Sequence, residues 1–176
     1  MSGVGPDGVA GEPDDLGDIT IPDDLSSLGG ADAAPDLAVV LTQIAEATPL
    51  AALCSAAQVV ADAVPTKVGA FAVLAERADG APQEAVAALS TLIRGVPFVL
   101  VEKRGEQLAA RRWQDGLPED ELAPGLVLGG APEAIEDVLI GHASVDELEG
   151  VVASSSISRL KAMRMLTSAA RKARKK

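Results

Sequence analysis

The apolar side chains of this sequence are almost all small, and this limits the kind of core that the chain can build. Alanine, valine and leucine dominate, whereas there are only two phenylalanines, one tryptophan and no tyrosine. Small side chains bury little area at each position, so stability has to come from many modest contacts. Because closely packed helices supply such contacts, we expect a domain that contains more helix than sheet.

The chain divides by composition into three zones. Residues 1–35 form an acidic leader, residues 36–153 a globular domain, and residues 154–176 a basic helix and tail. With 176 residues, of which 48% are hydrophobic, the chain is long enough for one ordinary domain with its own core. We expect this domain to be α+β and helix-rich, with a small sheet made of one β-hairpin and one or two short strands.

Apolar spacing, proline and glycine predict five helices in the domain. Asp36 is a favourable N-cap before a segment whose apolar residues recur at helical spacing, and Pro49 ends that segment. Gly95 and Gly141 follow two other periodic segments as C-caps, and Ser144 begins a capping box. The expected helices cover residues 36–48, 50–64, 82–94 and 132–140, and a fifth begins near Val145.

The segments expected for the sheet are less clear. Residues 67–77 favour a strand because Gly69 weakens a helix, although their alanines allow one. Residues 96–113 are typical of a hairpin with Gly105 in its turn, and a short helix over 106–113 is the rival interpretation. We expect a polar loop over residues 114–125, followed by a short strand or loop over 125–130.

The sequence offers little material for catalysis or cofactor binding. A G-x-G-x-x-G pattern starts at Gly3, but neither a strand precedes it nor a helix start follows it, so we interpret it as chance. The lone His142 is typical of a solvated turn, and Cys54 lies within an apolar segment. One histidine and one cysteine give no zinc pattern. We therefore expect no catalytic, cofactor or metal site, and we expect a protein that is not an enzyme.

Cysteine content and hydropathy help to predict the cellular compartment of the protein. A single cysteine cannot form an internal disulfide, which favours a reducing environment. The N-terminus is acidic and has no apolar signal segment, and the longest apolar stretches fall short of the ~18 residues that a membrane span needs. The sequence thus predicts a cytoplasmic protein without a membrane span.

The C-terminal segment, residues 158–176, contains eight basic side chains and no acidic one. Residues 1–158 hold the remaining seven basic side chains and all 26 acidic ones, which gives them a net charge of −19. Cations near the end of a helix complement its dipole, but this effect fades beyond the last turn and does not require eight of them. The predicted contact residues are Arg159, Lys161, Arg164, Arg171, Lys172, Arg174, Lys175 and Lys176.

A final helix is expected to carry these cations. One serine of the cluster at 154–158 would cap it, and its apolar residues would be Ile157, Leu160, Met163 and Leu166. Because these four recur strictly every third residue, they drift around a helix with 3.6 residues per turn. We therefore expect a narrow, twisted apolar stripe.

The leader, residues 1–35, combines eight acidic side chains with seven glycines, four prolines and no base. This composition predicts disorder. Exposed aliphatic residues spaced by aspartates are also typical of a peptide that docks on a partner, and a purely solvating leader is the alternative. The predicted contact residues of the leader are Leu16, Ile19, Ile21 and Leu25.

An acidic leader and a basic tail on one domain favour an adaptor or assembly scaffold that makes charge-complementary contacts. Its partner would be another protein or a second copy of the chain. The alternative is a nucleic-acid-associated protein that binds phosphates non-specifically through the tail. The acidic remainder of the chain and the lack of aromatic residues in the tail count against this alternative. An anionic membrane surface and the chain's own leader are further candidates.

Overall fold

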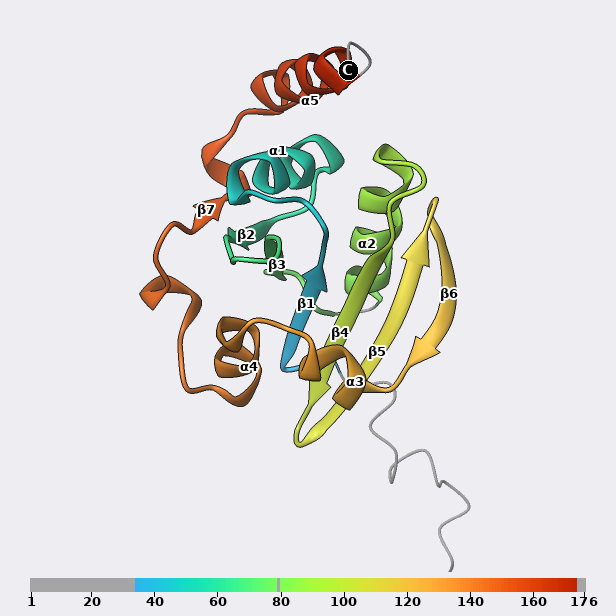
Figure 1. Cartoon of the computed structure of the whole chain (residues 1–176), viewed down its shortest axis with the longest axis vertical. Coiled ribbons are helices and arrows are strands. Elements are labelled where there is room, and N and C mark those ends of the chain that lie inside the picture. Colours follow the sequence, from blue (N-terminus) through green and yellow to red (C-terminus); the bar gives the residue numbers. More distant parts are fainter. Residues whose placement is uncertain (1–33, 79, 174–176) are drawn as a thin grey trace, which may run out of the picture. The chain divides into compact units, whose positions relative to one another are not determined.

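The computed structural model describes residues 34–78 and 80–173, and the predicted leader contacts therefore lie outside the described residues. Seven strands, five α-helices and two short 3₁₀ turns are found in these two ranges (Figure 1). In chain order they are β1 (Leu37–Leu41), α1 (Ala47–Ala57), β2 (Ala61–Val64), β3 (Phe71–Leu74), α2 (Ala81–Leu92), β4 (Phe98–Arg104), β5 (Gln107–Gln114), β6 (Leu117–Leu122), α3 (Pro124–Gly129), α4 (Glu133–Ile140), η2 (Val145–Glu147), β7 (Val152–Ala153), η3 (Ser154–Ser156) and α5 (Arg159–Ala173).

All seven strands join one antiparallel sheet in the order β6-β5-β4-β1-β3-β2-β7. The expectation of a helix-rich domain with a small sheet is therefore wrong. The expected helix over residues 36–48 is instead the central strand β1, whose Val39 and Val40 are fully buried on opposite faces. A strand that is covered on both faces reads as a continuous apolar run, and such a run also fits helical spacing.

Three other expectations for the domain are corrected. The segment 50–64 is helical only to Ala57, where Gln58 takes a left-handed conformation, and it continues as β2. The polar loop over 114–125 contains β6, and the GLVLGG segment at 125–130 belongs to the short helix α3. Asp115 and Gly116 both have positive φ angles, as a tight hairpin turn requires, and this turn joins β5 to the edge strand β6. The prediction of a loop was wrong because it was based only on the polar composition of the segment.

Other expectations are confirmed. Residues 71–74 form strand β3, and β4 and β5 form the expected hairpin, so the rival helix over 106–113 is wrong. Phe98 pairs with Trp113, and Gly105 lies in the turn with φ +58°. Helices α2, α4 and α5 match the expected segments, whereas the capping box at Ser144 begins only a 3₁₀ turn.

The sheet has an apolar cluster on each face. Helices α1 and α2 cover one face, and α3 and α4 contribute to the cluster on the other (Figure 1). Alanines make up much of the first cluster, and Phe98 and Trp113 are its only aromatic residues. The small side chains thus build a layered α/β/α core through many contacts, as the composition requires, but they do so on a broad sheet.

Helix α5 packs against α1 through the buried Ala162 and the partly buried Met165 and Leu166. The Ser158 hydroxyl accepts a hydrogen bond from the backbone N–H of Lys161 at 3.4 Å, which confirms that a serine of this cluster caps the helix. Among the described residues, no helix is long and apolar enough to cross a membrane.

Candidate functional site

Helix α5 presents a basic surface that its packing on α1 holds in place. The five cations of α5 that the structure describes, which are Arg159, Lys161, Arg164, Arg171 and Lys172, are all exposed. The three ion pairs found between described residues lie within β4 or between β5 and β6, and none of them uses a cation of α5. These charges are therefore available to a partner.

The outward face of α5 also exposes two apolar side chains. Leu160 is 75% exposed and Met163 is 47% exposed, whereas Leu166, three residues further, is partly buried against the core. The expected stripe therefore does drift around the helix, and it divides into a packed part and an exposed part. Exposed aliphatic groups beside exposed cations suit a protein surface that carries both acidic and apolar groups.

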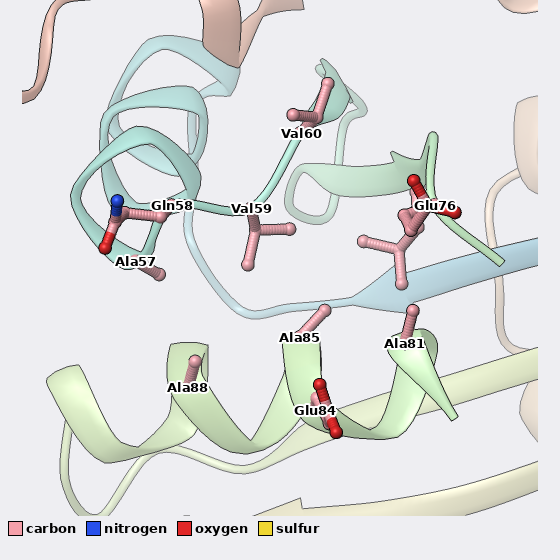
Figure 2. A pocket seen from close by; sticks show the side chains of 10 residues that line it. Ala57, Gln58, Val59, Val60, Glu76, Ala81, Glu84, Ala85 and Ala88 are labelled. Carbon is pink, nitrogen blue, oxygen red and sulfur yellow. The ribbon is translucent and has the colours of Figure 1, made fainter. Parts of the chain in front are cut away.

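An open pocket of about 400 Å³ lies between the end of α1, the end of β3 and the first turns of α2. Ala81, Ala85 and Ala88 line it on one face of α2, as Figure 2 shows, and the segment 57–60 lines the opposite wall. Leu74 completes the apolar lining. This volume falls within the range of pockets that hold small ligands or single peptide side chains.

Two carboxylates stand at the rim of this pocket. Glu76 follows β3 and Glu84 lies in the first turn of α2, and both side chains are exposed (Figure 2). Neither belongs to an ion pair between described residues. An apolar lining with negative charge at its edge suits a ligand that combines an aliphatic stem with a cationic head.

A second, smaller pocket of about 270 Å³ adjoins the first. It shares Gln58, Val59 and Val60 with the larger pocket, and its lining also includes Arg159 and the first two serines of η3. The start of α5 is therefore separated from the acidic rim by one short segment of chain. Val60, which is 59% exposed, thus lines both the acidic pocket and the smaller pocket that Arg159 also lines.

The single cysteine and the single histidine of the chain lie in different surroundings. Burial raises the pKa of the Cys54 thiol to about 12, which keeps it protonated. His142 is exposed in the turn after α4. Within residues 34–78 and 80–173, no three acidic, histidine or cysteine side chains gather into a set that could hold a metal ion.

The structure places five of the eight predicted tail residues on one exposed helix, and Arg174, Lys175 and Lys176 lie outside the described residues. Sequence reasoning missed the pocket and its two glutamates. One signal was present, because alanines at positions 81, 85 and 88 share a helix face, yet alanine in a helix normally indicates only high helix propensity. Comparison of the chain with models of protein families, with curated proteins and with solved structures found no match.

Proposed function

We propose that this chain is a protein-interaction protein of adaptor or assembly type, which binds a partner through the outward face of α5. One observation carries the proposal: α5 combines exposed aliphatic side chains with cations that form no ion pair with another described residue, on a helix that is anchored to the core. Because the helix is already packed on α1, binding does not have to provide the free energy of ordering it.

The chemistry of the surface defines the partner. Burial of Leu160 and Met163 contributes about 25 cal/mol for each Å² removed from water, so these residues supply affinity. The cations around them steer an acidic surface toward the helix and disfavour basic ones. A protein segment that carries both carboxylates and aliphatic groups meets both requirements.

Nucleic acid is the competing partner, since five exposed cations could also contact phosphates. Helix α5 has no aromatic side chain on which a base could stack, and residues 1–158 would repel a polyanion with their net charge of −19. We therefore favour a protein partner and include nuclease treatment in the test.

The test is affinity capture with the full-length chain from nuclease-treated lysate. Two variants with equal changes in charge are compared: Arg164→Glu with Arg171→Glu on α5, and Lys67→Glu with Arg94→Glu outside α5. We expect the wild-type and control chains to retain the same proteins, and the α5 variant to retain at least about tenfold less of them, as a loss of 1.4 kcal/mol in binding would cause.

Two results would count against the proposal. Equal retention by the two charge variants would exclude α5 as the contact surface. If nuclease treatment removed all retained material, the chain would instead be a nucleic-acid-associated protein. The aliphatic leader residues remain a separate prediction, which an Ile19→Ser and Ile21→Ser variant in the same capture would test.

A further inference from the structure

The pocket between α1 and α2 has the composition of a receptor for a lysine or arginine side chain. Three alanines of α2 offer methyl groups to an aliphatic stem, while Glu76 and Glu84 stand at the rim where a cationic head would lie. Long basic side chains bury their methylene groups in this way and keep the charge at the surface.

The end of α5 carries side chains of this kind. Arg171 and Lys172 are exposed and stand between two alanines, Ala170 and Ala173. The sequence then continues with three more basic residues, 174–176. Neither Arg171 nor Lys172 takes part in the ion pairs between described residues, and the same is true of the two pocket glutamates. The two surfaces are therefore complementary in charge and neither is neutralised within the described chain.

The position of α5 favours a second copy of the chain as the source of these cations. Arg159 lines the smaller pocket together with Gln58, Val59 and Val60, and these three residues also line the acidic pocket, whereas Arg159 does not. Because a helix rises 1.5 Å for each residue, Lys172 lies about 20 Å from Arg159 along the axis of α5. The basic end of α5 therefore lies about 20 Å along the helix axis from the residue that lines the neighbouring pocket.

We propose that this pocket binds the basic end of α5 from a second copy, so that chains associate head to tail. This inference rests on the proposed function, because it identifies one acidic partner of α5 as another copy. The contact is heterologous, because one chain contributes its pocket and the other its helix end. In a pair of chains, the first therefore keeps a free helix end and the second a free pocket, and each can bind a further copy. Association should therefore increase steadily with protein concentration and weaken with salt.

The experiment measures the mass of the full-length chain by sedimentation over a wide concentration range at low salt. The pocket variant carries Glu76→Gln and Glu84→Gln, and in the helix variant all five basic residues from position 171 onward are changed to Gln. The weight-average mass of the wild-type chain should rise above 17.8 kDa with concentration. Each variant alone should stay at the monomer mass, as should an uncharged Ala85→Leu variant that fills the pocket.

Mixing the two charge variants provides the decisive control. The intact helix of the pocket variant should bind the intact pocket of the helix variant, so the mixture should reach twice the monomer mass and grow no further. A monomeric wild-type chain at every concentration would overturn the inference, as would association of either variant alone. The proposed function is tested separately by the capture experiment. If the chain stayed monomeric but its captured partner were lost in the Arg164→Glu and Arg171→Glu variant, the proposed function would stand and the contact between copies would be excluded.

Discussion

Cys54 shows how strongly the core excludes charge. Its side chain is fully buried in α1, and desolvation raises the pKa of its thiol from 9.0 to about 12. The thiol is therefore protonated in the folded chain, whereas in the unfolded chain it ionises near its ordinary pKa. Folding stability is unaffected by this group below about pH 9 and declines as the pH rises toward 12.

We expect Cys54 to react with a thiol reagent at pH 8 only in denaturant. From about pH 9 upward the free energy of unfolding should fall by up to about 1.4 kcal/mol per pH unit through this group alone. Chemical denaturation across this pH range, with Cys54→Ala as the control, measures the effect. Rapid labelling of the native chain, or an identical pH dependence in the control, would contradict the burial.

Gly69 is a position that a side chain cannot occupy. Its φ is +140°, and a Cβ atom there would lie 2.8 Å from the carbonyl oxygen of Thr42. We expect Gly69→Ala to destabilise the fold by about 2–4 kcal/mol. Gly141→Ala provides the control, because its φ is +79° with open space around it, and it should cost only about 1 kcal/mol. Equal midpoints in urea would refute the steric argument.

At the scale of elements, Ser154 joins the end of the chain to the sheet. Its buried hydroxyl accepts a hydrogen bond from the backbone N–H of Ala61 and donates one to the carbonyl of Val59, both at 3.0 Å. Ser154→Ala should cost about 1–3 kcal/mol because it leaves these buried groups without a partner. Ser155→Ala, at an exposed position, should be nearly neutral in thermal unfolding. A similar loss in both variants would show that the hydroxyl is not the cause.

Helices and strands were predicted correctly from the sequence where a local signal was strong. The prediction failed where burial in the folded domain determines whether a segment is a strand or a helix. Gly105 marked the β4–β5 hairpin, and Gly141 marked the end of α4. Nothing local distinguishes β1 from a helix, because Ala38–Val40 is apolar on both faces. The basic helix was predictable from its charge, whereas the pocket depends on how far apart α1 and α2 lie.

In the whole molecule, α5 covers part of α1 and also carries the proposed contact surface. A chain that ends at Ser158 would expose the part of α1 against which Ala162 and Met165 pack. We expect this truncation to lower the free energy of unfolding by about 2–4 kcal/mol and to raise binding of a hydrophobic dye. The charge variant Arg164→Glu with Arg171→Glu should leave stability within about 0.5 kcal/mol, since both residues are exposed. If truncation left stability unchanged, α5 would be an appendage only.

The two outer strands of the sheet determine how crowded copies of this protein can meet. Strand β6 presents a proline followed by Glu119, Asp120 and Glu121, and strand β7 is only two residues long. If the β6 strands of two copies paired, their acidic side chains would repel one another. The proline would also leave one hydrogen bond between the strands unformed, because it has no backbone N–H group. A concentrated solution should therefore resist conversion into β-rich fibrils. Any contact between copies, such as the one proposed above, would then use side-chain surfaces, and salt would weaken it.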